Sequence, residues 1–205
     1  MPSLITFGPL RIEYADDTLR PRPWTEQQSS WAHELLEDAP PGPVLELCAG
    51  VGHIGLLAVL GTDRGLVCVD SSASACAYAR RNVAAAGRDD VAEVRHGAMD
   101  TVLMPEERFA LVIADPPWVP TDRTARFPED PLASIDGGAD GLDVARTCVE
   151  VAARHLLRDG VLLLQLGERQ QVDALARELA ETAELGVREV RDGAGGVLVL
   201  LGRPR

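Results

Sequence analysis

From Val44 onward the chain alternates between short apolar runs and helical segments, and this alternation limits the fold more than any other feature. The runs VLEL, GLVCVD, VAEVRH, FALVIAD and GVLLLQLG have the length of strands, and helical patterns separate most of them. Such an order predicts an α/β sandwich built on a mostly parallel sheet. Two last runs, GVREVRD and GVLVLLG, flank a glycine-rich turn and predict a C-terminal hairpin with one antiparallel strand.

The segment before Val44 has a different pattern. LITFGPLRIEY predicts a hairpin around Gly8 and Pro9, and TLRPRPW is extended because its prolines restrict the backbone. Thr25 is the expected N-cap of a helix that runs to about Asp38. The helix expected much later in the chain, near Leu142, runs to about Leu157.

Composition excludes several classes of protein. A net charge of -12 over 205 residues argues against broad nucleic-acid binding, and the pairs Arg20/Arg22 and Arg80/Arg81 are interpreted as solvated surface charge. The four cysteines lack the spacing of a zinc site, and Cys48 and Cys68 are expected inside apolar strands. No apolar run is long enough to span a membrane, and the N-terminus lacks the pattern of a signal peptide, so we expect a cytoplasmic protein without a membrane partner.

The stretch VLELCAGVGHIG is the first candidate for chemistry. A strand containing Glu46 leads through the small residues Cys48, Ala49, Gly50 and Gly52 into a helix. Small residues let a ligand approach the backbone, and a helix N-terminus offers unpaired N–H groups. The stretch does not fit the dinucleotide pattern G-x-G-x-x-G, because its first turn position is Cys48. A tight turn without a ligand is the alternative.

Two acids are expected at strand ends. Asp70 ends the strand GLVCVD, where doubly wound folds place an acid that binds ribose hydroxyls; the alternative is a cap for the helix near Ser72. Asp115 ends the strand LVIAD and is followed by Pro116, Pro117 and Trp118. Asp115 and the Pro116 carbonyl can accept from a planar group that bears N–H donors, and Trp118 can stack on it. The alternative is a structural turn with a surface tryptophan. The irregular stretch that follows, to about Asp140, is long enough to indicate a function.

These motifs together resemble the class I S-adenosylmethionine-dependent methyltransferases. ELCAGVGHIG is similar to the first motif of that superfamily, Asp70 matches the acid after its second strand, and DPPW is similar to the [N/D]-P-P-[Y/F/W] motif of enzymes that methylate planar nitrogens. LRPRPWTE and the stretch from Ile135 to Gln170 further resemble the PrmC/HemK family, which methylates glutamines of peptide release factors.

The resemblance implies a Rossmann-like sandwich with a seven-stranded sheet. It implies one domain over residues 1–205, with residues 1–40 covering the site and residues 41–205 forming the catalytic core. It implies S-adenosyl-L-methionine as the cofactor and a direct transfer of its methyl group to nitrogen. The implied catalytic residues are Asp115, Pro116, Pro117 and Trp118, and the implied cofactor-binding residues are Thr25, Glu46, Cys48, Ala49, Gly50, Gly52, Asp70, Ser71, Ala98, Met99 and Asp115.

Three departures from the family pattern leave the acceptor open. About forty residues precede the cofactor strand, where the family has a helical domain that holds release factors. Ala98 replaces an acid of the third motif, so Asp100 must substitute for it or the adenine contact is lost. Asp115 replaces an asparagine; an ionised aspartate only accepts hydrogen bonds, so it suits an exocyclic amine better than an amide unless it holds a proton.

Three hypotheses follow. The first is a protein-glutamine methyltransferase. The second is a methyltransferase for an exocyclic amine of a nucleobase or small metabolite, in which the acidic net charge makes nucleic acid the less favoured acceptor. The third is a cofactor-binding scaffold without catalysis.

Overall fold

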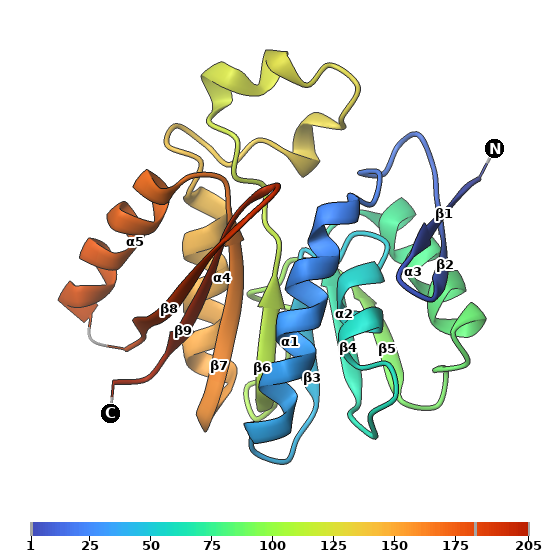
Figure 1. The fold of residues 1–205 in the computed structure, drawn as a ribbon, viewed down its shortest axis with the longest axis horizontal. Coiled ribbons are helices and arrows are strands. Elements are labelled where there is room, and N and C mark those ends of the chain that lie inside the picture. The colour runs from blue at the N-terminus through green and yellow to red at the C-terminus, as the bar shows by residue number, and fades with distance from the viewer. Residues whose placement is uncertain (1, 183, 205) are drawn as a thin grey trace.

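A computed structural model describes residues 2–182 and 184–204 and has a central seven-stranded sheet (Figure 1). The strand order is β5-β4-β3-β6-β7-β9-β8, and β9 is antiparallel to both of its neighbours, while the other pairings are parallel. The predicted fold class, with its closing hairpin, is confirmed. The strands are β3 (Val44–Leu47), β4 (Leu66–Asp70), β5 (Ala92–His96), β6 (Phe109–Ala114), β7 (Leu156–Leu166), β8 (Gly186–Gly193) and β9 (Gly196–Gly202).

Helices cover both faces of this sheet, so the central strands β3 and β6 are buried along their whole length and apolar except for Glu46. Alternate residues of β3 point to opposite faces: Val44 belongs to one buried cluster, and Leu45 and Leu47 to the other. The first face carries α1 (Glu26–Asp38), α2 (His53–Ala58) and α3 (Ala73–Ala85), and the second carries α4 (Asp143–His155) and α5 (Arg169–Thr182).

The chain changes direction across the sheet between β3 and β6. From β3 the next two strands, β4 and β5, extend the sheet one way, and β6 then pairs with the opposite side of β3. Open α/β sheets bind ligands in the crevice at the carboxyl ends of the strands at such a switch point. The turn after β3 and the residues after β6 therefore lie at the same edge of the sheet.

The N-terminal hairpin forms as predicted but stays outside the main sheet. β1 (Ser3–Phe7) and β2 (Leu10–Tyr14) pair only with each other, and Gly8 turns between them with a φ of +54°. Asn82 of α3 anchors β2, because its side chain accepts from the Glu13 N–H (2.8 Å) and donates to the Glu13 carbonyl (3.0 Å).

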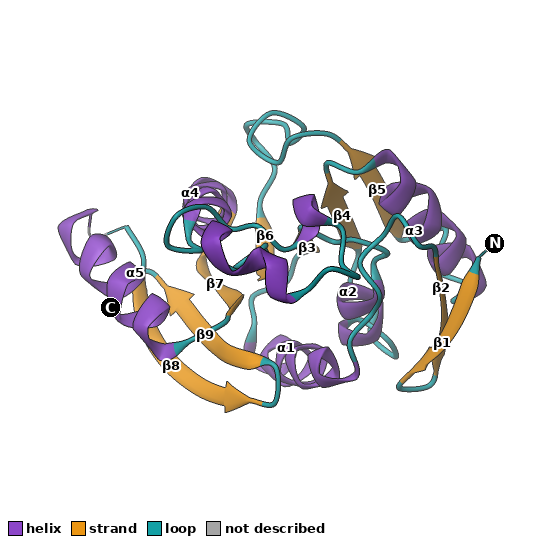
Figure 2. Cartoon of the chain, turned by 90° about the horizontal axis from the view of Figure 1, so that it is seen from above, coloured by secondary structure: helices purple, strands orange, loops and turns teal. Residues whose placement is uncertain are grey.

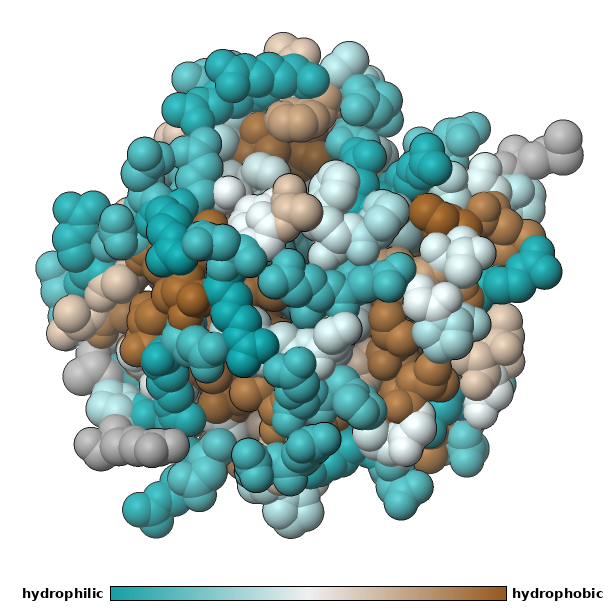
Figure 3. Space-filling model, in the orientation of Figure 1, coloured by the Kyte–Doolittle hydropathy of each residue, from teal (hydrophilic) through white to brown (hydrophobic). Residues whose placement is uncertain are grey.

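The long segment after β6 lies over the carboxyl ends of the strands (Figures 1 and 2). It contains two short 3₁₀ helices, η2 (Thr121–Arg126) and η3 (Leu132–Ser134), so it is more regular than the irregular stretch expected. Across the face seen in Figure 3, hydrophilic side chains separate the apolar ones into patches. No helix within the described ranges is long and apolar enough to cross a membrane.

Three local expectations need correction. The helix expected to reach Leu157 ends at His155, because Leu156 already pairs with Phe109 as the start of β7. Cys48 lies in the turn after β3 rather than inside a strand. Thr25 occupies the N-cap position of α1, but its hydroxyl donates to the Arg22 carbonyl (2.8 Å) and makes no capping bond.

Candidate active site

The turn between β3 and α2 brings exposed backbone to the switch point. Cys48, Gly50 and Gly52 all have left-handed φ angles, of 54°, 53° and 77°. A Cβ added at Gly50 would meet nothing within 4 Å, whereas one at Gly52 would lie 3.4 Å from the Ala79 Cβ. Gly50 therefore leaves open space beside the backbone, while Gly52 serves the turn and the packing of α3.

Asp70 holds this turn to the next one. One carboxylate oxygen accepts from the Gly50 N–H (2.7 Å), and the other accepts from the Ser72 N–H (2.8 Å). The cap of α3 is Ser72, whose hydroxyl accepts from the Ala75 N–H (3.2 Å), so the alternative role of Asp70 as a helix cap is not realised. Its predicted contact with a ribose stays a prediction.

Glu46 is a buried acid beneath the turn, with 2% of its surface exposed. One oxygen accepts from the Cys68 thiol (3.3 Å), and the other has no partner among the described residues. Burial raises the pKa of Glu46 to about 7, against the lowering effects of the Gly55 backbone N–H and the Cys68 thiol. A Cβ at Gly55 would come within 2.5 Å of the Glu46 carboxylate, which explains the glycine there.

Cys48, in the place of a motif glycine, faces α4. Its Sγ lies 4.0 Å from the Sγ of Cys148, and the Sγ of Cys148 lies 3.7 Å from the Sδ of Met99. The contact with Cys148, together with burial, raises the pKa of the Cys48 thiol. Cys48 and Met99 thus pack at the border between the turn and the core.

The other predicted cofactor residues lie in turns at the same edge. The Ala49 N–H donates to the Val69 carbonyl (3.1 Å), and Ser71 is exposed directly after β4. The carbonyl of Ala98 accepts from the Val102 N–H (3.0 Å) in the turn after β5, where Asp100 is exposed. No interaction here tests whether Asp100 replaces the missing acid, and that substitution stays a prediction.

A narrow cavity of about 100 Å³, here named the Asp115 pocket, lies at the end of β6. Its wall comes from residues 19–25 of the N-terminal segment, residues 115–119, residues 127–135 of the long loop, and Gln165 of β7. Arg22 joins two of these walls, because its guanidinium donates to both carboxylate oxygens of Asp130 (2.5 Å each). The interpretation of Arg22 as solvated surface charge is therefore wrong.

Asp115 lines this pocket, and no described residue donates a hydrogen bond to its carboxyl group. None of the hydrogen bonds within residues 2–182 and 184–204 reaches its carboxyl group, and the next two residues are prolines, which lack an N–H. Asp115 is partly buried, and the loss of solvent around its carboxyl group raises its pKa to about 7.

Trp118 is fixed by segments that the sequence places far away. Its carbonyl accepts from the side chain of Gln171 (2.8 Å), and a Cβ at Gly141 would lie 2.3 Å from that oxygen. A Cβ at Gly167 would lie 2.3 Å from the indole ring. The glycines at 141 and 167 are therefore needed for close approach to Trp118, and this accounts for two glycines of the stretch from Ile135 to Gln170 that resembles the family.

Two polar residues of the site were missed by sequence reasoning. Gln28 donates to the Ala114 carbonyl (3.0 Å) and the Leu163 carbonyl (3.3 Å), and so fixes the end of β6. His53 lies with its Nε2 3.3 Å from the Thr25 hydroxyl, and burial lowers its pKa to about 3. Gln28 could have been found from its position on the buried face of an amphipathic helix.

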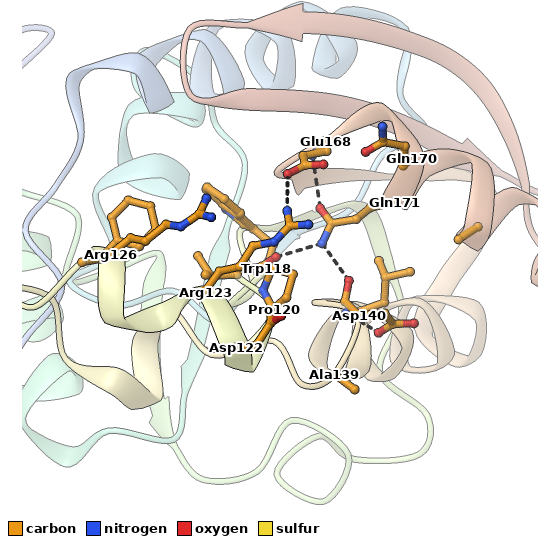
Figure 4. A pocket seen from close by; sticks show the side chains of 14 residues that line it. Trp118, Pro120, Asp122, Arg123, Arg126, Ala139, Asp140, Glu168, Gln170 and Gln171 are labelled. Carbon is orange, nitrogen blue, oxygen red and sulfur yellow. Dashed lines mark hydrogen bonds and ion pairs between the residues drawn. The ribbon is translucent and has the colours of Figure 1, made fainter.

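A second cavity of about 370 Å³, here named the loop cavity, lies beyond Trp118 (Figure 4). It is bordered by η2 and by the start of α5, where Arg123 forms an ion pair with Glu168 (2.9 Å). Trp118 contributes to the walls of both cavities.

Comparisons with known proteins agree with this fold. Residues 29–127 match the family described as the Methyltransferase small domain. The catalytic domain of hMettl16, solved in complex with the MAT2A 3′UTR hairpin 6, superposes with a TM-score of 0.74 at 16% identity, over 95% of this chain and 75% of that one. At that identity the likeness shows the fold alone.

Two curated relatives are nearer in sequence. The release factor glutamine methyltransferase of Pseudomonas aeruginosa is 35% identical over 96% of this chain and 72% of its own length. The ribosomal protein uL3 glutamine methyltransferase of Burkholderia pseudomallei is 37% identical over 65% of this chain, and the match spans about half (47%) of that protein. The chain therefore belongs to the PrmC/HemK family of S-adenosylmethionine-dependent methyltransferases.

Proposed function

We propose that the protein methylates the side-chain amide nitrogen of a glutamine in another protein, with S-adenosylmethionine as the methyl donor. The observation that carries this proposal is the Asp115 pocket, which is lined by Asp115 and Pro116 at the end of β6, the strand that pairs with β3 and its glycine turn. The relatives named as release factor and uL3 glutamine methyltransferases support the same acceptor.

The turn after β3 fits the cofactor. Gly50 leaves open space beside the backbone, and Glu46 has an unpaired buried oxygen that an ammonium group could satisfy. Asp70, at the next strand end, keeps acceptor capacity for ribose hydroxyls, because each oxygen has a further lone pair. When bound, the cofactor supplies a methyl group activated by its sulfonium sulfur.

The residues around Asp115 orient the nitrogen. An amide nitrogen is a weak nucleophile because its lone pair is delocalised into the carbonyl. Hydrogen-bond acceptance by Asp115 and by the Pro116 carbonyl would fix both N–H bonds and leave the lone pair free to point at the methyl carbon. The same acceptors stabilise the positive charge that develops on nitrogen, and once the methyl group is transferred the nitrogen would lose one proton to solvent.

The size of the pocket favours a small acceptor group over a flat base. The cavity holds about 100 Å³, and the indole of Trp118 already packs against Gly167. An exocyclic amine offers only N–H donors, so it would use both oxygens of Asp115 as acceptors only if that group were ionised. The surroundings of that side chain oppose ionisation.

A labelling experiment tests the proposal. The purified protein is incubated with methyl-tritiated S-adenosylmethionine and, in turn, with release factors, uL3, tRNA and rRNA from its host. We expect label in a glutamine of a release factor or of uL3, located by mass spectrometry. The Gly50→Val variant should lose both labelling and cofactor binding. Label confined to RNA, or none in either protein while calorimetry shows cofactor binding, would contradict the proposal.

A further inference from the structure

We infer that Asp115 meets the acceptor as a neutral carboxylic acid, whose O–H donates to the amide carbonyl while its other oxygen accepts from the amide N–H. This inference rests on the proposed function, because it concerns how the same pocket holds a glutamine side chain.

The chemistry of a primary amide sets the requirement. Its carbonyl oxygen accepts hydrogen bonds, and its NH₂ group donates two. A side chain that holds both ends must donate with one atom and accept with another. A neutral carboxylic acid does so, whereas an ionised carboxylate would turn one oxygen against the carbonyl oxygen of the amide.

The backbone around Asp115 supplies nothing for a negative charge. A carboxylate at the end of a strand usually accepts from N–H groups one or two residues later, but here those residues are Pro116 and Pro117. The side-chain NH₂ group of Gln28, near this strand end, donates to the carbonyls of Ala114 and Leu163 rather than to Asp115.

The charged groups on neighbouring elements do not compensate. Glu46 on β3 is itself an acid whose charge couples to Asp115, and Cys48 in the following turn is a neutral thiol with a raised pKa. Arg22 is the one cation among the described residues that line the pocket, and both of its short contacts go to Asp130. His53 on α2 is neutral, since burial lowers its pKa to about 3. Burial thus leaves the pKa of Asp115 raised to about 7.

The direction of the pH dependence follows from this geometry. The neutral acid is present below the pKa of the folded protein and is lost as the pH rises through about 7. Affinity for the amide should therefore fall with rising pH. An asparagine at position 115 keeps one donor and one acceptor at every pH, so Asp115→Asn is the matched control.

The first experiment uses the enzyme in complex with S-adenosylhomocysteine. It measures the affinity of this complex for the acceptor that the labelling experiment identifies, a release factor or uL3. S-adenosylhomocysteine is used because its sulfur carries no charge that would lower the pKa of Asp115. Above the pKa of Asp115, we expect the affinity of the wild type for the acceptor to fall tenfold for each further pH unit, relative to that of Asp115→Asn. Equal pH profiles for the two proteins would overturn the inference.

The second experiment needs no acceptor. In the unfolded chain an aspartate has a pKa of about 3.9. Because the pKa of Asp115 is raised to about 7 in the folded protein, the wild type loses stability as the pH rises from the unfolded value to the folded one. The free energy of unfolding of Asp115→Asn minus that of the wild type should grow over this window and then level off. Glu46 titrates in both proteins, so only the part of its contribution that arises from its coupling to Asp115 remains in the difference. A difference that does not vary with pH would overturn the inference.

The two experiments separate this inference from the proposed function. Glutamine methylation with a flat stability difference would leave the function standing and reject the neutral acid. A stability difference that grows as expected, without glutamine methylation, would reject the function and with it the pairing of Asp115 with an amide.

Discussion

Asp70 and Asp115 stand at equivalent places, each at the carboxyl end of a parallel strand that flanks β3, yet their surroundings are opposite. Both oxygens of Asp70 accept backbone N–H groups, from Gly50 and Ser72. No described residue donates to Asp115. One acid is built into the backbone of the site, and the other is left for a ligand.

The residues that follow each acid explain the difference. Asp70 is followed by two serines, whose N–H groups are available, and the second of them reaches back to the carboxylate. Asp115 is followed by two prolines, which offer carbonyls only. A strand-end acid followed by prolines therefore signals an unsatisfied carboxyl group, whereas one followed by ordinary residues signals a closed turn.

The largest expected effect is that of Asp115→Ala. Loss of one oriented group that acts mainly in the transition state typically costs about 3 kcal/mol, or roughly a hundredfold in rate. Affinity for S-adenosylhomocysteine should stay nearly unchanged, because Asp115 supports no part of the turn after β3. Turnover of the acceptor identified by labelling checks the loss of rate, and calorimetry checks the affinity for S-adenosylhomocysteine. Full turnover in this variant would make Asp115 an ordinary turn residue.

Asp70→Ala should have the opposite signature. Two N–H groups would lose a charged acceptor, and hydrogen bonds of that kind contribute about 1.5–3 kcal/mol each. We expect lower stability in chemical denaturation and weaker cofactor binding in calorimetry, with a smaller loss for Asp70→Asn, which keeps one acceptor oxygen. If Asp70→Ala binds the cofactor normally, the contrast between the two acids fails.

The sequence is sufficient to predict the sheet and the two acids, because strand ends and glycine turns are local features. Contacts between segments that are distant in the chain could not be predicted from the sequence. The ion pair of Arg22 with Asp130 joins residues 108 positions apart, and Gln28 reaches carbonyls of two strands that are 86 and 135 positions away. The inference that an acid without donors holds a proton also needed the structure, since the sequence shows only that two prolines follow it.

That ion pair provides the third prediction. Arg22→Ala would detach the N-terminal segment from the long loop and leave Asp130, whose side chain is 7% exposed, without its cation. We expect a few-fold higher KM for the acceptor, of the order of 1 kcal/mol, with little change in cofactor affinity. Arg123→Ala is the control, because it breaks a more exposed pair with Glu168 beside the loop cavity. The same rise in KM in both variants would show that the effect is not local to the Asp115 pocket.

The smallest effect is expected at Cys48, in the turn that Asp70 holds. A residue other than glycine at a φ of 54° is strained by about 1–2 kcal/mol, so Cys48→Gly removes strain. It also loosens the unfolded chain, by about 0.4–1 kcal/mol, and loses the contact with Cys148. The net change in the free energy of unfolding should stay below about 1 kcal/mol, and cofactor affinity should be kept. Cys48→Ala retains the strain and loses the sulfur, so it should be the less stable of the two variants in denaturant melts. If alanine proves more stable than glycine, backbone strain at Cys48 does not limit the stability of this turn.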